Sequence, residues 1–247
     1  MNIAISDKKS FISRFLTPIN KLNENIILKV NPDNITSVSS SQDGTCIIYS
    51  TFRQANPEVT DQIRLNVPDI SRLIKVLSCV NDSDIGLKYS GNSVKYESAS
   101  TRFTYHLLED GIISTPAVSI EKIKQLDFDI NFDISKQHIL SLIKASTFTT
   151  ESDKIYFSAK DGSVYCELTD RERQNVDSFS IEVSNEVSGT GNNSFSPLAI
   201  NFEILRAISS IQFDAIKVYI NISKNVFLFD IDIDNISINI IASGYIQ

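Results

Sequence analysis

The order of predicted helices and strands in the first half of the 247-residue chain is kept in the second half. The first half reads as a strand and a helix, then four strands, a second helix and three strands. An internal repeat of this kind predicts a duplicated α+β domain of about 120 residues, with two helices among seven to eight strands in each copy. We expect two similar domains, at 1–110 and 125–247, whose helices pack on antiparallel sheets, and a connector at 111–124.

Four amphipathic helices define this repeat. Asp7 is the candidate N-cap of the first, Pro68-Asp69 opens the second, Ser135 caps the third, and the fourth covers roughly 201–210. Pro18 lies inside the first pattern and predicts that this helix bends or ends there, because proline lacks an N–H. The expected apolar face of the third helix consists of Ile139, Leu140, Leu142 and Ile143.

Short similar segments indicate which parts of the two halves correspond. The turn Asp43-Gly44 resembles Asp161-Gly162, and the alternation of apolar residues in 179–183 resembles that in 63–67. The spacing between such pairs varies because the second half contains an insertion at 184–197. Its polar, glycine-bearing composition predicts a surface loop.

The charge of the chain is unevenly distributed. With 23 Lys and Arg against 30 Asp and Glu, the net charge of −7 by itself argues against a nucleic-acid partner. The solvent-facing stripe of the four predicted helices nevertheless carries six cations and one anion, Glu203. A solvated surface explains any one helix, whereas the same bias on all four indicates a helical surface that faces a polyanion. The six cations are Arg14, Lys21, Arg72, Lys75, Lys144 and Arg206.

Several functional classes lack the residues that they require. Three cysteines without a CxxC pair, and two histidines, are too few for structural zinc. The series Asp230, Asp232 and Asp234 fits a solvated strand face better than a metal loop. Since no GxSxG or HExxH motif occurs, we expect neither an enzyme nor a cofactor. The first residues lack a secretory signal and no apolar run is long enough to cross a membrane, so we expect a cytoplasmic protein without a membrane partner.

Four segments carry a resemblance to a known family. They are KKSFISRFLTPINKLNENIILKV, LNVPDISRLIKVLSCVNDSDIGLKY, FDISKQHILSLIKASTF and DKIYFSAKDGSVYCELTDRE. In this order they resemble the DNA polymerase sliding clamp, or processivity factor, of T4-type bacteriophages. The resemblance implies a DNA-clamp fold and a homotrimer that closes head to tail into a pseudo-sixfold ring around double-stranded DNA. It also implies an ATP-dependent clamp loader, a replicative DNA polymerase as partner, and the cytoplasm of an infected host cell as location.

The resemblance also implies two contact surfaces. The subunit interface would join two edge strands and involve Arg102, Phe103, Tyr105, Leu107, Phe179, Ile181 and Val183. A pocket for partner peptides would involve Leu107, Leu108, Ile112, Ile113, Pro116, Tyr245 and Ile246. The apolar connector residues could equally well cover the junction between the domains. An alternative function is a duplicated β-rich structural or adaptor subunit of a virion or protein complex, without DNA contact.

Overall fold

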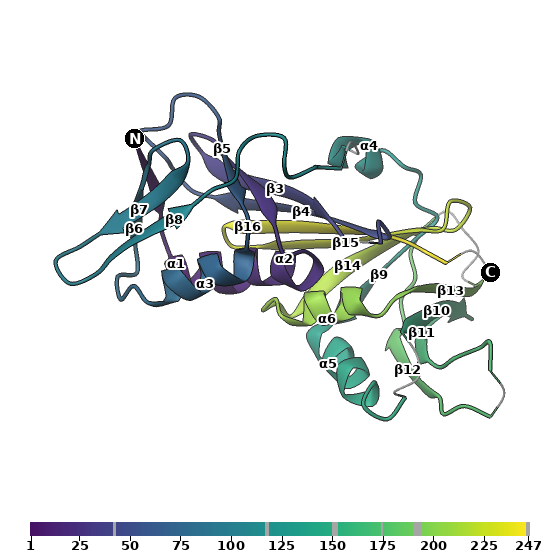
Figure 1. Cartoon of the computed structure of the whole chain (residues 1–247). Coiled ribbons are helices and arrows are strands. Elements are labelled where there is room, and N and C mark those ends of the chain that lie inside the picture. The colour runs from purple at the N-terminus through teal and green to yellow at the C-terminus, as the bar shows by residue number, and fades with distance from the viewer. Residues whose placement is uncertain (42, 117–118, 150–152, 174, 190–193, 246–247) are drawn as a thin grey trace. The chain divides into compact units, whose positions relative to one another are not determined.

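A computed structural model describes residues 1–41, 43–116, 119–149, 153–173, 175–189 and 194–245. The chain divides into two compact units (Figure 1). The first unit contains Met1–Gln42, Ile47–Ala117 and Asp232–Ile238, and the second contains Asp43–Cys46, Val118–Ile231 and Asn239–Gln247. The segment at 232–238 is the tip of a hairpin from the second half of the sequence, and it belongs to the first unit.

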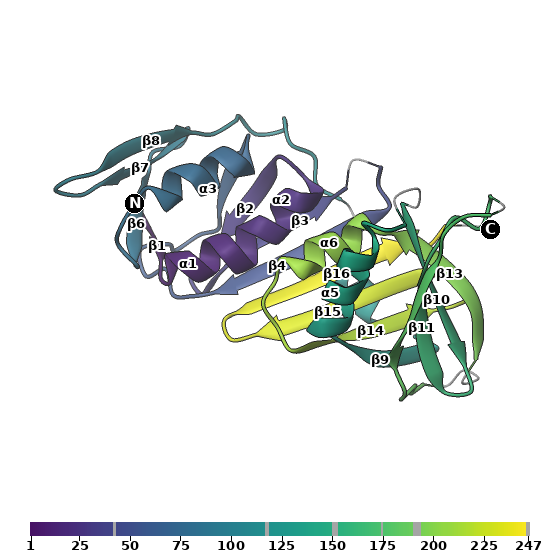
Figure 2. The ribbon, with the colours of Figure 1, turned by 90° about the horizontal axis from the view of Figure 1, so that it is seen from below.

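The first unit contains two four-stranded antiparallel sheets, in the orders β1-β6-β7-β8 and β5-β2-β3-β4. Its helical segments are α1 (Lys8–Ser10), the π-helical η1 (Phe11–Leu16), α2 (Thr17–Leu22) and α3 (Ile70–Ser78). Its strands are β1 (Asn2–Ile5), β2 (Ile26–Val30), β3 (Asn34–Ser40), β4 (Cys46–Arg53), β5 (Ile63–Val67), β6 (Ile85–Tyr89), β7 (Ser93–Glu97) and β8 (Arg102–His106). In Figure 2 the helices lie over one face of the sheet that contains β2, β3 and β4.

The second half of the chain forms strands in the orders β9-β14-β15-β16 and β13-β10-β11-β12. Its helices are α4 (Ile120–Lys124), α5 (Lys136–Ala145) and α6 (Glu203–Ser209). Its strands are β9 (Ile130–Ser135), β10 (Lys154–Lys160), β11 (Ser163–Leu168), β12 (Phe179–Ser184), β13 (Phe195–Asn201), β14 (Ala215–Asn221), β15 (Val226–Ile233) and β16 (Ile236–Ser243). The short helix α4 lies at the end of the predicted connector at 111–124.

The strand orders confirm that the fold is duplicated. Counting strands from the start of each half, both halves form one sheet in the order 1-6-7-8 and one in the order 5-2-3-4. Each half thus has the α+β architecture predicted from the sequence. None of the helices among the described residues is long and apolar enough to cross a membrane.

Two predicted correspondences between the halves are wrong. Asp161-Gly162 joins β10 to β11, whereas Asp43-Gly44 lies between β3 and β4, one hairpin further along the repeat. The segment 179–183 is the counterpart of β4 and not of 63–67. Both errors have one cause: turn chemistry and apolar alternation recur in every hairpin, so they do not identify which hairpin of the repeat is present.

The predicted insertion at 184–197 also hides a strand. Its last residues begin β13, which pairs with β10 at the edge of its sheet. Pro197 lies within β13, and an edge strand tolerates a proline because one side of the strand needs no N–H donor. Because Pro197 and the polar residues before it are typical of loops, the start of β13 was not predicted, although the repeat requires a strand at this position.

Pro18 does not end the first helix, contrary to one of the two outcomes predicted for it. Thr17 has helical backbone angles (φ −62°, ψ −43°) and its N–H donates to the carbonyl of Ile12, five residues earlier. Pro18 then occupies the first turn of α2, where a missing N–H is tolerated. The wider π turn before it leaves room for the proline ring, so the helical path continues to Leu22.

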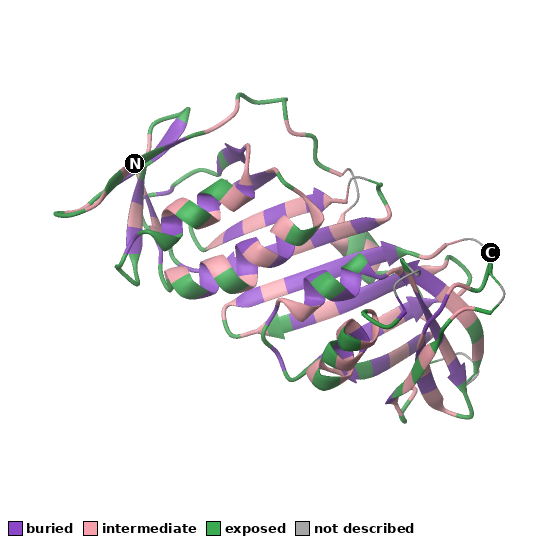
Figure 3. Cartoon of the chain, turned by 60° about the horizontal axis from the view of Figure 1, so that its bottom comes forward, coloured by how far each residue is buried: buried purple, intermediate pink, exposed green. Residues whose placement is uncertain are grey.

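The hydrophobic cores are built from the faces that the periodicities predict. In the first unit Phe11 of the first helix contacts Phe52 of β4, with ring centroids 5.2 Å apart. In the second unit Phe157 of β10 contacts Phe227 of β15 at 5.3 Å. Buried and exposed residues alternate along strands and around helices (Figure 3). One prediction is wrong: Leu140 of α5 is 43% exposed, because only one side of this helix meets the core.

The N-cap of the first helix gives a testable contribution to stability. The Asp7 carboxylate accepts a hydrogen bond from the Ser10 N–H, and Asp7 has a left-handed backbone (φ 53°). Hydrogen bonding to the Ser10 side chain and, second, to the Ser10 N–H lowers the pKa of Asp7. Replacing Asp7 with alanine removes the cap and should reduce the free energy of unfolding by about 1–2 kcal/mol. Asp7→Asn keeps an acceptor and tolerates this backbone, so it should reduce the free energy less.

The pH dependence of this effect has a defined sign. Because the folded-state pKa of Asp7 is depressed, its charge stabilises the fold above the unfolded-state pKa, and this is lost as pH falls through the folded-state pKa. The stability difference between the wild type and Asp7→Asn should therefore be constant near neutral pH and vanish in acid. Urea unfolding at a series of pH values measures it, and a difference that grows in acid would refute this role.

Candidate nucleic-acid interface and assembly surfaces

Most of the six helical cations are exposed in the folded chain. Lys21 at the end of α2, Arg72 and Lys75 on α3, and Lys144 near the end of α5 all reach solvent. Their positions follow from the apolar stripes of these helices, which Ile70, Leu73 and Leu77 form on α3. The Asp69 side chain caps α3 by accepting from the Arg72 N–H, and Ser135 caps α5 in the same way. The Ser135 cap is as predicted, and α3 begins directly after Pro68-Asp69, as predicted.

Two of the predicted cations are engaged by carboxylates. Arg206 of α6 pairs with Glu203 at 2.8 Å, and its guanidinium lies over the Phe202 ring. Arg14 pairs with Asp234 at 2.7 Å, and its side chain is only 23% exposed. Neither arginine presents a fully uncompensated charge. Ser10, one helical turn before Arg14 and expected on the same solvent-facing stripe, is buried, at 9% exposed.

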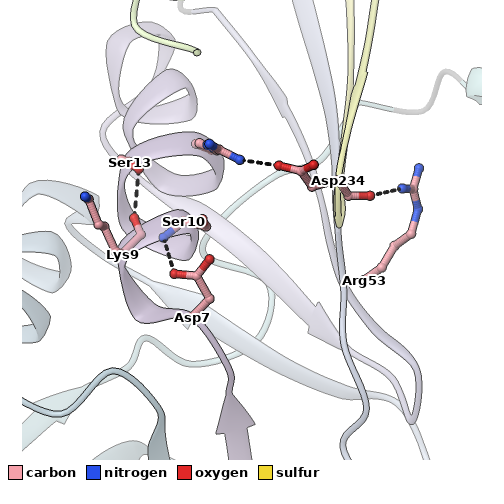
Figure 4. Close-up of polar contacts among 7 residues, drawn as sticks. Asp7, Lys9, Ser10, Ser13, Arg53 and Asp234 are labelled. Atoms are coloured by element: carbon pink, nitrogen blue, oxygen red, sulfur yellow. Dashed lines mark hydrogen bonds and ion pairs between the residues drawn. The ribbon is translucent and has the colours of Figure 1, made fainter. Parts of the chain in front are cut away.

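The Arg14 contact belongs to a cluster around the hairpin tip at 232–238 (Figure 4). The Arg53 guanidinium donates to the Asp232 carboxylate at 2.7 Å and to the Asp234 carbonyl at 3.0 Å. The Arg53 N–H also donates to the Asn235 carbonyl at 2.7 Å. Two arginines of the first unit thus hold an acidic hairpin tip against the end of β4. Sequence periodicity did not reveal this cluster, because its members are about 180–220 residues apart.

Sequence reasoning also missed a lysine that joins two helices. The Lys136 ammonium donates to the backbone carbonyls of Ser209 and Ile211, and it lies over the Phe213 ring. These carbonyls belong to the C-terminal end of α6 and the turn after it, where a cation is favourable. Burial lowers the pKa of Lys136. Lys136 thus holds α5 against the end of α6. In the sequence, the feature that could have indicated this role is a lysine in the first turn of a helix that Ser135 caps.

The first predicted interface strand lies at the edge of a sheet. β8 is the last strand in the order β1-β6-β7-β8. The Leu107 N–H donates to the Asn92 carbonyl and the Ser98 N–H donates to the Thr101 carbonyl, so odd-numbered residues of β8 bond toward β7. The backbone groups of three residues therefore point away from the sheet. These are Arg102, Thr104 and His106.

The second predicted interface strand is also an edge. β12 is the first strand in the order β12-β11-β10-β13, with a register shift against β11 near Val164. Unpaired edges are ready templates for another strand. Of the side chains named for this interface, Tyr105 and Val183 lie in the cores behind the two edges, 8% and 2% exposed. The Tyr105 hydroxyl donates to the Asp69 carbonyl, and burial raises the pKa of Tyr105.

The residues predicted for a partner-peptide pocket lie in different units. The segment from Leu107 to Pro116 belongs to the first unit, where Ile112 is 62% exposed. The Asn66 amide holds the start of this segment by donating to the Leu108 carbonyl and the Asp110 carboxylate. Tyr245 belongs to the second unit, with Lys154 over its ring, and Ile246 is outside the described residues. The pocket remains a prediction.

Among the described residues, no group of three His, Cys, Asp or Glu side chains could hold a metal ion. Asp232 and Asp234 are instead bound by arginines, and Asp230 accepts a hydrogen bond from Asn239 at 2.9 Å. None of the three cysteines, all of which are described, forms a disulfide: Cys46 and Cys166 are buried and Cys79 is exposed on the turn after α3. Burial raises the pKa of Cys46 to about 12, so this thiol is inert at neutral pH.

Comparison with solved structures identifies the fold. The chain matches A. fulgidus PCNA, in a structure with the C-terminal region of FEN-1 bound, at 10% identity and a TM-score of 0.75, covering 100% of this chain and 98% of that one. Proliferating Cellular Nuclear Antigen from Entamoeba histolytica matches at 13% identity and 0.76, covering 99% and 98%. PCNA from Thermococcus kodakaraensis matches at 14% identity and 0.75, covering 99% of each chain.

No family model matches the sequence, and none of the curated proteins does. At identities of 10–14% the likeness to PCNA is one of fold. The predicted class, an α+β DNA-clamp fold with two similar domains, is therefore confirmed.

Proposed function

We propose that this chain is the subunit of a ring-shaped sliding clamp, which encircles duplex DNA and tethers the replicative DNA polymerase to its template. The observation that carries the proposal is a pair of open strand edges in a duplicated fold. In the first unit the edge of β4 is covered by the hairpin tip that leads into β16. The counterpart of β4 in the second half is β12, and the counterpart of β16 in the first half is β8. Joining β12 of one copy to β8 of the next would repeat the same junction between chains.

A contact between two different surfaces of identical chains generates a ring when the rotation closes. Three copies, as the resemblance to phage clamps implies, would give six similar domains with pseudo-sixfold symmetry. The expected mass is about 83 kDa, three times the 27.6 kDa of the chain. The interface would use the predicted residues on β8 and β12, with backbone hydrogen bonds along both edges.

The exposed helical cations suit the interior of such a ring. A clamp that slides must contact phosphates and not base edges, because phosphate contacts carry no sequence information. Lys and Arg side chains that reach phosphates directly or through water provide weak, salt-sensitive contacts. The acidic remainder of the chain disfavours DNA on the outside, so the net charge of −7 is compatible with this function.

The proposed partners are a clamp loader that uses ATP and a replicative polymerase that docks a short peptide near the connector. Ile112, the most exposed large apolar side chain among the described residues, is a natural part of that docking site. A. fulgidus PCNA binds the C-terminal region of FEN-1, which supports peptide docking by this fold. We propose that the chain comes from a T4-type phage, acts in the cytoplasm of the infected host cell, catalyses no reaction and needs no cofactor.

The test is a processivity assay with the cognate loader, ATP and polymerase on singly primed circular template. We expect the protein to lengthen the products of a single binding event, and to stay bound to circular DNA but slide off after the circle is cut. Retention that requires a closed DNA circle distinguishes a ring around the DNA from ordinary affinity for DNA. An adaptor subunit without DNA contact would give neither result, and that outcome would refute the proposed function.

A further inference from the structure

The contact inside the chain and the proposed contact between chains have opposite charge polarity. In the first unit the receiving strand β4 ends in a basic cluster, formed by Arg53 and Arg14, and the hairpin tip that it receives is acidic. The β15–β16 tip contributes Asp232 and Asp234 to this contact. We call the end of the receiving strand the socket and the hairpin turn the tip.

The socket of the second half is acidic. A groove of about 600 Å³ lies beside the end of β12, between β12 and β9, and three carboxylates line it: Asp133, Glu182 and Glu186. Asp133 lies directly opposite Lys217 in the β9–β14 pair, so these two charges offset each other. Lys217 is the only Lys or Arg among the described residues that line the groove, so the lining offers no further cation to offset Glu182 and Glu186.

The β7–β8 hairpin of the first half has a net positive charge. Its strands β7 and β8 carry Lys95, Glu97 and Arg102 at exposed positions, and Lys88 of β6 lies directly opposite Lys95. Like charges in this position disfavour the sheet unless an anionic partner is nearby. Arg102 pairs with Glu97, but its side chain is 78% exposed, and such surface pairs exchange readily.

The internal contact fixes the direction of the external one. Within the first unit, the N–H of Arg53 at the C-terminal end of β4 donates to the carbonyl of Asn235, the residue just before β16 begins. An equivalent contact between copies places Arg102, the first residue of β8, at the C-terminal end of β12, which is Ser184. The basic tip of one copy would then meet the acidic socket of the next.

We infer that this reversed polarity is a recognition code, through which the acidic socket at Glu182 and Glu186 receives the Arg102 tip of a second copy of this chain. The inference rests on the proposed ring and names the charges that direct it. Each wrong combination brings like charges together: the acidic tip is repelled by the β12 socket, and the basic tip by the β4 socket. Repulsion of wrong partners is an effective source of specificity, because it acts even where the strand edges are interchangeable. The charges therefore favour binding of the β15–β16 tip to β4 of its own chain, and binding of β12 to the β8 edge of a neighbouring copy.

The experiment is a charge swap in the full-length chain, read by sedimentation over a concentration series. Arg102→Glu should weaken assembly at least about tenfold, because it places an anion in an acidic socket. The triple variant R102E/E182R/E186R has an acidic tip and a basic socket in every copy and should restore assembly. When mixed with wild type, the triple variant should form rings with itself and exchange no subunits with wild-type rings.

Lys224→Glu, in the exposed β14–β15 turn, is the matched control: it changes the charge equally and should leave assembly unchanged. Circular dichroism and thermal unfolding check that all variants fold. The code is overturned if R102E assembles as wild type does, if the triple variant is as weak as R102E, or if it mixes freely with wild type. A wild-type chain that is monomeric throughout would instead overturn the proposed ring, so the two failures are distinguishable.

Discussion

Replacing Thr104 with proline should leave the chain folded but monomeric, with a mass of 27.6 kDa instead of about 83 kDa. The Thr104 N–H points away from β7, because the bonds of Leu107 and Ser98 place the odd-numbered residues of β8 toward the sheet. Proline is tolerated in an edge strand when its N–H would face solvent. In a ring the same position would face β12 of the next copy, where proline removes a donor and its ring obstructs the approaching strand.

Two further variants make this result interpretable. Thr104→Val keeps the N–H and a β-branched side chain, so it should assemble as wild type does. Phe103→Pro removes a bond toward β7 and should destabilise the first unit by about 3 kcal/mol or more, measured by urea unfolding. Sedimentation of the three variants separates loss of assembly from loss of fold. A Thr104→Pro protein that still sediments at the mass of a trimer would exclude β8 from the interface.

The parts of the fold that were predicted correctly are governed by neighbouring residues. Asp7 and Ser135 were recognised as caps because an N-cap acts on an N–H three residues later. The alternating segment 63–67 coincides with β5 because apolar alternation is a local pattern. The duplicated order of elements was visible for the same reason, since it needs only a succession of such local patterns.

The parts that were missed depend on contacts between distant residues. The π turn before Pro18 shows that a helix can absorb a proline when its buried face is well packed, as it is by Phe15 and Ile19. The ion pair between Arg14 and Asp234 joins residues 220 positions apart, so the charges along one helix could not show that Arg14 has a carboxylate partner. Which strands lie at edges is likewise set by pairing across the chain, and the sequence offers no local signal for it.

This correction determines which cations should matter most for DNA. Arg14 and Arg206 are bound by carboxylates, whereas four other helical cations are exposed: Lys21, Arg72, Lys75 and Lys144. Replacing these four with glutamate should abolish retention on circular DNA and processive synthesis. The fold should survive, with stability changed by no more than about 0.5 kcal/mol per site, because the side chains lie on solvent-facing stripes.

A control of equal charge separates contact from net charge. Lys122, Lys124, Lys160 and Lys224 are exposed but lie outside the four helices of the repeat, and replacing them with glutamate changes the net charge equally. If DNA passes along the helices, only the helical variant should lose DNA, and variants lacking single cations should lower the slope of log affinity against log salt by about 0.9 for each phosphate contact removed. Equal loss in both quadruple variants would mean that long-range charge, and not a helical surface, governs binding. A salt slope unchanged by every single replacement would place the DNA on another face of the molecule.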